Sequence, residues 1–298
     1  MKFFDRCLVV PGQDPWVVPM GRARYLLVQS INEAKIVGLE FYETKFVGEH
    51  MLWKPPKWPK RDKQSDHGKQ LWAPEIHEFD NFGYVMYIAA SDGNNSNHRI
   101  YALQSHSLTG PYVEIGKVCD TRNDFWAIDL TVFTYEGELY AIWSGWDGLG
   151  VEFPQNLYIA PMSDPFTISG ERVLLRRPEH GWEMSYAPLL EGPQAHQHNG
   201  NLFVTYAADA SWTPEYKTGV LVFLGGSPLD SSSWEKLPYP FLIGGGHGSF
   251  VTLNDQTLFV YHRKTTEDFG WGDRKICWAS VEWDIRGLPV FKDIELVA

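Results

Sequence analysis

Short runs of apolar residues, many of them alternating with polar ones, fill the chain, and glycine, proline, asparagine and serine separate these runs. Runs of this length and period are typical of β-strands bounded by turns. No long stretch shows the 3.6-residue period of an amphipathic helix. The pattern therefore predicts an all-β protein.

Five of the predicted strands resemble one another, and they begin at Tyr25, Tyr87, Tyr140, Phe203 and Phe259. Their starts are 62, 53, 63 and 56 residues apart. Four of the five follow a turn rich in glycine, asparagine or acidic residues, at 81–83, 136–138, 199–201 and 254–255. A second strand follows each of the five, at 36–41, 100–105, 157–163, 220–226 and 276–283. The chain is therefore an internal repeat of strand pairs.

A unit of about 60 residues has the size of one four-stranded propeller blade with generous loops. The alternative, a pair of β-sandwiches, does not explain the even spacing of five units. The sequence predicts one domain over residues 1–298, a five-bladed β-propeller.

A distinctive short motif precedes each strand pair, and one residue of each motif serves as its landmark. The landmarks are Asp14, Trp72, Asp129, Glu191 and His247, which are 58, 57, 62 and 56 residues apart. Their period matches that of the strands. Since equivalent positions of successive blades point at the same axis, we expect these five side chains to converge.

Three of the five landmarks are carboxylates, namely Asp14, Asp129 and Glu191. Clustering like charges raises at least one pKa, which provides one protonated acid beside one ionised base. Hydrolysis of a glycosidic bond uses that combination. Each carboxylate taken alone has a simpler reading as a turn or cap residue, as for Asp14 before Pro15. The common phase of all three with the blades favours the catalytic interpretation.

The motifs at 12–15, 72–75, 126–129, 191–193 and 246–249 resemble, in order and spacing, those of glycoside hydrolase family 43. The resemblance covers essentially the whole chain. It implies that Asp14 is the general base, that Asp129 orients the acid and tunes its pKa, and that Glu191 is the general acid. It also implies inversion of the anomeric configuration and no cofactor for the chemistry.

Stretches 155–162, 167–170 and 211–214 are similar to exo-acting α-L-arabinofuranosidases within this family. The implied reaction is release of terminal α-L-arabinofuranose from arabino-oligosaccharides or arabinan. Two alternatives stay open: a β-xylosidase of the same family, and a non-catalytic sugar-binding propeller. The second alternative has no need of three carboxylates. We further expect segment 49–71, with Trp53 and Trp58, to wall off one end of the site.

Other site residues follow from the same resemblance. Trp72 is expected to form an apolar wall for the terminal sugar, with a core tryptophan as the alternative. Arg274 is expected to bind sugar hydroxyls, with Arg263 as its rival. His247 is expected to hold a structural calcium on the axis, although calcium prefers oxygen ligands; the alternative is a neutral histidine hydrogen-bonded between blades. Trp16 and Trp146 are weaker candidates for the flanks of the pocket.

Charge and cysteine content limit the partners and the location. The net charge of −11 argues against nucleic acid or an anionic membrane as a partner. The sequence contains no apolar run of 18 residues that predicts a membrane span. Three widely spaced cysteines and the lack of a signal-like apolar stretch at the start predict a cytoplasmic protein. The alternative is a secreted protein whose signal peptide has been removed from the sequence. The sequence does not decide the oligomeric state.

Overall fold

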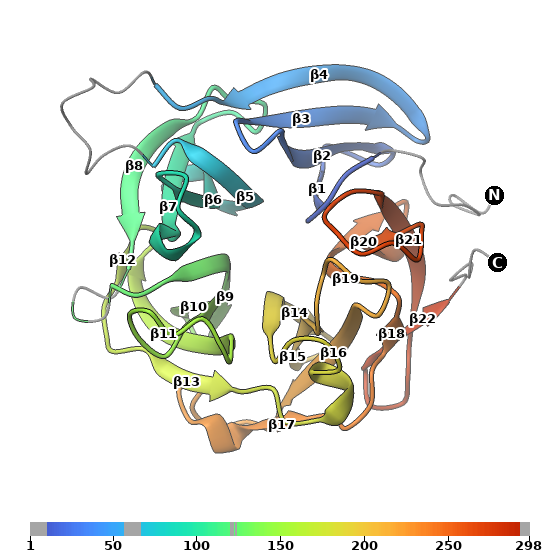
Figure 1. Cartoon of the computed structure of the whole chain (residues 1–298). Helices are drawn as coiled ribbons and strands as arrows, with labels where there is room; N and C mark the ends of the chain where they lie inside the picture. The colour runs from blue at the N-terminus through green and yellow to red at the C-terminus, as the bar shows by residue number, and fades with distance from the viewer. Residues whose placement is uncertain (1–10, 57–66, 120–121, 123, 293–298) are drawn as a thin grey trace.

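The computed structural model describes residues 11–56, 67–119, 122 and 124–292. Their strands form five separate antiparallel sheets arranged in a ring (Figure 1), which confirms the predicted five-bladed β-propeller. Blade 1 contains β1 (Trp16–Pro19), β2 (Arg24–Ile31), β3 (Lys35–Tyr42) and β4 (Lys45–Trp53). Blade 2 contains β5 (Lys69–Phe79), β6 (Gly83–Ser91), β7 (Arg99–Ser105) and β8 (Val113–Val118), with the short 3-10 helix η1 (Asn95–Asn97) before β7.

Blades 3 and 4 have a divided outer edge. Blade 3 contains β9 (Ala127–Tyr135), β10 (Glu138–Gly145) and β11 (Asn156–Asp164), and β12 (Thr167–Ile168) and β13 (Val173–Arg176) both pair with β11. The 3-10 helix η2 (Gly181–Glu183) leads to blade 4. Blade 4 contains β14 (Leu190–His198), β15 (Asn201–Ala208) and β16 (Lys217–Phe223), and β17 (Trp234–Lys236), after η3 (Ser231–Ser233), and β18 (Leu242–Ile243) both pair with β16.

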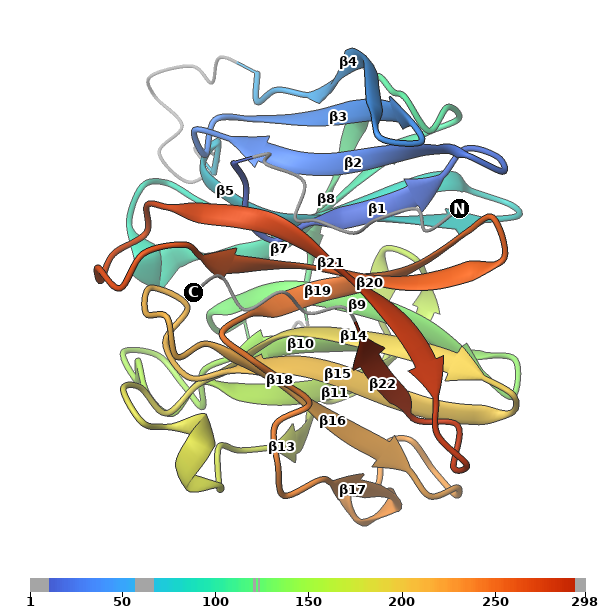
Figure 2. The same ribbon diagram turned by 90° about the vertical axis from the view of Figure 1, so that its right-hand side faces the viewer.

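Blade 5 closes the ring and contains β19 (Gly246–Leu253), β20 (Gln256–Lys264), β21 (Arg274–Trp283) and β22 (Pro289–Lys292). Figure 2 shows this blade between blade 1 and blade 4. Pro11 forms an antiparallel bridge with Lys275, and the Gly12 amide donates to the Arg274 carbonyl at 3.2 Å. The segment that leads into blade 1 is thus fastened to blade 5.

The predicted strand pairs are the second and third strands of each blade. Their continuous apolar runs reflect burial on both faces, because each blade packs between two neighbours. The five large clusters of buried side chains each mix residues from two adjacent blades, as in the cluster that joins Leu26 and Leu52 of blade 1 to Met86 of blade 2. The core therefore lies between the sheets, and the innermost strands face the axis.

The predicted turns connect the first strand of a blade to the second. Asn199-Gly200 and Asn254-Asp255 both have positive φ at each residue and close the β14–β15 and β19–β20 hairpins. Asn, Asp and Gly tolerate this left-handed backbone, which matches the twist of the paired strands. The landmark residues precede the strand pairs as we expected, and those after Asp14 lie on the first, innermost strand of their blades.

Candidate active site

All five landmark residues line one pocket of about 430 Å³ at the axis. Four of them come from the innermost strands β5, β9, β14 and β19, and Asp14 directly precedes β1. The structure thus brings together the three carboxylates, Trp72 and His247. Arg274, at the start of β21, also lines the pocket, whereas its rival Arg263 does not.

A left-handed residue interrupts the innermost strand or its approach in every blade. Positive φ angles occur at Asp14 (48°), Ala73 (44°), Asp129 (57°), Gly192 (51°) and His247 (49°). In blades 2 to 5 the ladder to the second strand shifts register at the same place. Such bulges re-aim side chains, and non-glycine residues adopt this conformation only where the surroundings enforce it. The bulges turn the landmark side chains toward the pocket.

Glycine is required at position 192. A Cβ added there would lie 2.6 Å from Cγ of His247, and the backbone is left-handed. The close approach lets the Gly192 amide donate to Oδ2 of Asp129 at 2.9 Å. Because Gly192 follows Glu191, this hydrogen bond connects Asp129 to the backbone that carries Glu191.

Two histidines lie against Asp14. Oδ1 of Asp14 is 3.4 Å from Nδ1 of His247 and 3.4 Å from Nδ1 of His262. Burial lowers the pKa of His262 to about 3, so this ring is neutral at ordinary pH. Its Nδ1 accepts the Asp14 amide hydrogen at 3.1 Å, which fixes the neutral tautomer.

The pKa of the Asp14 carboxyl lies below its ordinary value. Burial alone raises it, but His247, His262 and Arg274 together more than offset that effect. Arg274 is held nearby, since it donates to the side-chain oxygen of Gln13 and to the Trp271 carbonyl. The lowered pKa favours the ionised carboxylate of Asp14.

Glu191 is the acidic counterpart of Asp14. Burial raises its pKa to about 7, with further contributions from Asp129 and Asp14. Its Oε1 accepts from the Tyr216 hydroxyl at 2.7 Å, and its Oε2 accepts from Nε2 of Gln155 at 3.2 Å. Both bonds fix the carboxyl group in the pocket. With this pKa, Glu191 carries a proton under mildly acidic conditions.

Asp129 is the third carboxylate of the pocket. Burial and the charge of Asp14 raise its pKa well above the usual range, while the Gly192 hydrogen bond opposes them. Its Oδ2 is also 3.7 Å from Nδ1 of His247. Separate environments thus push the pKa values of Asp14 and Glu191 apart, a pattern that is typical of a base and an acid in one pocket.

Aromatic rings form much of the pocket wall. Trp72 stacks on His98 with ring centroids 3.8 Å apart, and Trp126 stacks on Trp146 at 4.6 Å. Trp72 and Trp146 therefore lie where the sequence placed them. Trp16 does not line the pocket, because its Nε1 donates to the Ile76 carbonyl at 2.8 Å and its ring packs on His77.

Several residues of the site carry no repeat signal. Gln155 and Tyr216 lie on or beside outer strands, and His262 lies on β20, so the landmark period misses them. Glu75 belongs to a motif that the sequence singled out without a role. It is buried, and its Oε2 is hydrogen-bonded to Nε2 of His77 at 3.0 Å. Burial raises the pKa of its carboxyl group well above the usual range.

Segment 49–71 falls partly outside the described residues, since 57–66, and with them Trp58, are not described. Trp53 is buried in the cluster between blades 1 and 2 and does not wall the pocket. Gln70, near the end of this segment, does line the pocket, as do Glu152 and Phe153 from a loop of blade 3.

The donor set around His247 bears on the calcium prediction. In the parts of the chain that the structure describes, no group of three His, Cys, Asp or Glu side chains is arranged to hold a metal ion. Nδ1 of His247 faces two carboxylates at ion-pair distances. These residues do not fit a calcium held by protein ligands, and calcium bound through water stays a prediction. No helix in the described segments is long and apolar enough to cross a membrane.

Comparisons with known proteins agree with this site. The model of the glycosyl hydrolases family 43 matches residues 8–289. An extracellular exo-α-(1→5)-L-arabinofuranosidase of Streptomyces chartreusis is 31% identical over 279 residues, which cover 88% of this chain and 82% of the relative. The enzyme of the same name from Streptomyces avermitilis is 31% identical over 244 residues, which cover 75% of this chain. The match spans only 50% of that relative's length.

Solved structures extend the comparison. The crystal structure of an α-L-arabinofuranosidase from Lactobacillus brevis superposes with a TM-score of 0.83 and 26% identity, covering 95% of this chain and 94% of the other. A thermostable family-43 glycoside hydrolase gives a TM-score of 0.77 at 24% identity, covering 95% and 92%. The second likeness supports the fold.

The predicted cytoplasmic location is wrong. Two of the relatives are named extracellular enzymes, which points to secretion. Few cysteines do not indicate a reducing compartment here, because a propeller with five interblade cores is large enough to be stable without disulfides.

The matched family model covers nearly the whole chain, and it agrees with the resemblance found in the five motifs. Its carbohydrate substrates also suit a pocket with paired carboxylates and aromatic walls. This chain belongs to the glycosyl hydrolases family 43 and is a glycoside hydrolase.

Proposed function

We propose that the chain is an inverting, exo-acting α-L-arabinofuranosidase. The observation that supports this most is the separation of two pKa values in one pocket: that of Asp14 is lowered, and that of Glu191 is raised to about 7. The names of the relatives indicate L-arabinofuranose as the sugar that is released. A pocket with walls from several blades suits a terminal residue of a sugar chain.

In the proposed reaction Asp14 removes a proton from a water molecule, whose oxygen attacks the anomeric carbon. Glu191 donates its proton to the glycosidic oxygen as the bond from that oxygen to the anomeric carbon breaks. The water oxygen enters from the face opposite the leaving group, so the configuration inverts. The proton lost by water replaces the one given up by Glu191 after exchange with solvent.

The remaining residues prepare these two groups. The charge of Asp129 adds to the effect of burial in raising the pKa of Glu191, which favours its protonated form. Asp129 also accepts a hydrogen bond from the Gly192 amide. Arg274 supports the ionised state of Asp14 and presents donors to sugar hydroxyls. Trp72 offers an aromatic wall to the sugar ring.

Initial rates on p-nitrophenyl α-L-arabinofuranoside and p-nitrophenyl β-D-xyloside test the substrate. We expect the arabinofuranoside to be cleaved with the higher kcat/KM; a higher kcat/KM for the xyloside would make the enzyme a β-xylosidase. Asp14→Ala and Glu191→Ala should each lower kcat by about 10² to 10⁴, the usual contribution of general acid–base catalysis. Unchanged circular dichroism would show that both variants fold, and full activity in either would refute the assigned roles.

A further inference from the structure

Four aromatic residues form a continuous strip from the pocket to the outer surface. Trp212 and Trp271 line the pocket, and Trp271 is 61% exposed. Phe269 and Tyr186 are 59% and 52% exposed. We call Tyr186, Trp212, Phe269 and Trp271 the rim aromatic shelf. Single exposed rings are common on protein surfaces, but a contiguous group of them next to a pocket is typical of a ligand-binding site.

Direct contacts join the shelf residues, although they come from three different loops. The rings of Trp212 and Trp271 are 5.1 Å apart at 57°, and those of Tyr186 and Phe269 are 5.2 Å apart at 81°. The Gly270 amide donates to the Trp212 carbonyl at 2.8 Å, which connects the two pairs.

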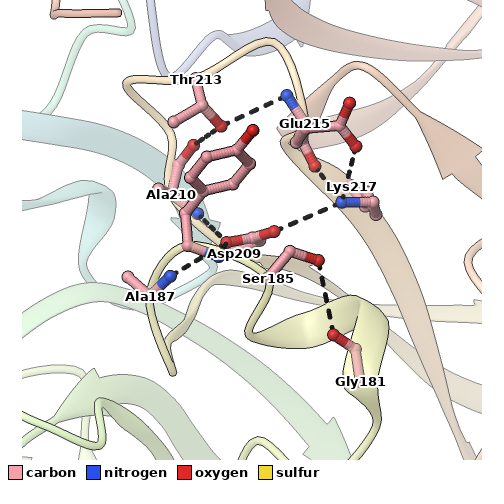
Figure 3. Close-up of polar contacts among 9 residues, drawn as sticks. Gly181, Ser185, Ala187, Asp209, Ala210, Thr213, Glu215 and Lys217 are labelled. Atoms are coloured by element: carbon pink, nitrogen blue, oxygen red, sulfur yellow. Dashed lines mark hydrogen bonds and ion pairs between the residues drawn. The ribbon is translucent and has the colours of Figure 1, made fainter.

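A buried carboxylate fixes two of the three loops (Figure 3). Oδ1 of Asp209 accepts from the amides of Tyr186, Ala187 and Ala210 at 2.8–3.1 Å. Its Oδ2 lies 3.3 Å from Nζ of Lys217, which is also buried. Asp209 thus connects the loop of Tyr186 to the loop of Trp212.

The third loop is fixed from beneath by a buried lysine. Nζ of Lys264 donates to the carbonyls of Gly270 and Gly272 at 2.9 and 3.0 Å. The Thr265 amide donates to the Asp273 carbonyl at 3.0 Å and closes the loop. The shelf is therefore held in place before any ligand arrives, which lowers the entropic cost of binding.

The charges around the shelf define its ligand. The exposed acidic residues of these loops are Glu215, Glu267, Asp268 and Asp273. They repel an acidic polymer but not a neutral one. Aromatic faces pack against the apolar faces of sugar rings. Since a pocket encloses only the terminal sugar, the chain beyond the scissile bond has to leave across the rim.

We propose that the rim aromatic shelf binds the leaving-group side of a neutral oligosaccharide whose terminal sugar occupies the pocket. The identity of the sugar in this inference rests on the proposed function, whereas the aromatic contacts of the shelf suit any neutral pentose chain. It makes Phe269 and Tyr186 determinants of chain-length preference that touch no catalytic group.

The test uses Phe269→Ala and the double variant Phe269→Ala/Tyr186→Ala. The control is Phe46→Ala, which removes an equally exposed ring, 58% accessible, from β4 of blade 1. Kinetics are measured on p-nitrophenyl α-L-arabinofuranoside and on linear arabinopentaose. We expect kcat/KM for the pentaose to fall about threefold to tenfold, mainly through KM, as for loss of one or two aromatic contacts. The nitrophenyl substrate and the control variant should change less than about twofold by the same reasoning.

In the kinetic comparison, either of two results would overturn the proposal. Equal losses on both substrates would show a structural effect on the pocket, and no loss on either would show that the shelf binds no sugar.

If the wild type cleaves no arabinofuranoside, the proposed function fails while the shelf is still tested. In that case titration calorimetry with arabinopentaose and xylopentaose should show weaker binding to the double variant, and equal binding of both sugars to all variants would refute the shelf. A dimer that becomes a monomer in the double variant would instead make the shelf a contact between two copies of the chain.

Discussion

Replacing Tyr216 by phenylalanine should move the basic limb of the profile of activity against pH to higher pH. The Tyr216 hydroxyl donates to Oε1 of Glu191 at 2.7 Å and thereby lowers the pKa of that carboxyl. Phenylalanine keeps the buried ring and its stacking on His262, whose centroid lies 5.3 Å away. The substitution therefore removes one hydrogen bond and little else. Because Glu191, as the proposed acid, has to be protonated to act, a higher pKa extends activity to higher pH.

The size of the shift follows from the two charge states of Glu191. A hydrogen bond to the ionised carboxylate contributes about 1.5–3 kcal/mol, and one to the neutral acid about 0.5–1.5 kcal/mol. The difference, about 1–1.5 kcal/mol, corresponds to about one pKa unit. The limb should therefore move from about pH 7 to about one unit higher.

The assay is kcat/KM against pH, because that ratio reports the pKa values of the free enzyme. Tyr206→Phe is the matched control: the Tyr206 hydroxyl donates to Oε1 of buried Glu183 at the same 2.7 Å, and neither residue lines the pocket. This variant should lose stability without moving either limb. A basic limb of Tyr216→Phe that stays in place or moves to lower pH would refute the assignment of Glu191 as the acid.

Three further predictions concern the same pocket. Asp129→Asn should lower kcat by about tenfold or more and move the basic limb downward, since Glu191 loses a neighbouring charge that raises its pKa; a pH profile of wild-type shape would contradict this. Proton NMR during the first turnovers should show the β-anomer of arabinofuranose released from an α-linked substrate, and the α-anomer would mean retention. Incubation with EDTA should leave kcat/KM unchanged within about twofold, because the described residues offer no set of three metal ligands; loss of activity that added calcium restores would show that the enzyme depends on a calcium ion.

The repeat pattern was sufficient to predict the ring of blades. Interblade packing imposes the same burial on equivalent strands, so Tyr25, Tyr87 and Phe203 occupy equivalent places and are all buried. The same logic brought the five landmarks to the axis. A position that repeats in every blade leaves a signal in the sequence, because every blade is subject to the same geometry.

Residues outside that geometry could not be found in this way. Gln155 and Tyr216 contact Glu191 from the loops that lead into β11 and β16. The course of these loops depends on side chains far away in the sequence. The left-handed backbone of Asp129 and His247 is also invisible to pattern analysis, since neither residue type requires it. Compartment was misjudged because cysteine content reflects a need for crosslinks, and this fold has little need of them.

The seam between the first and last blades has a consequence for inactivation. Asp14 belongs to the first blade by sequence, but Gly12 and Gln13 beside it are bonded to Arg274 of the last blade. A local opening of this seam displaces Asp14, the proposed base, while the other four blade interfaces stay packed. On heating, catalytic activity should therefore disappear at a lower temperature than the sheet signal in circular dichroism, and the loss should reverse on cooling for as long as the remaining blades stay folded.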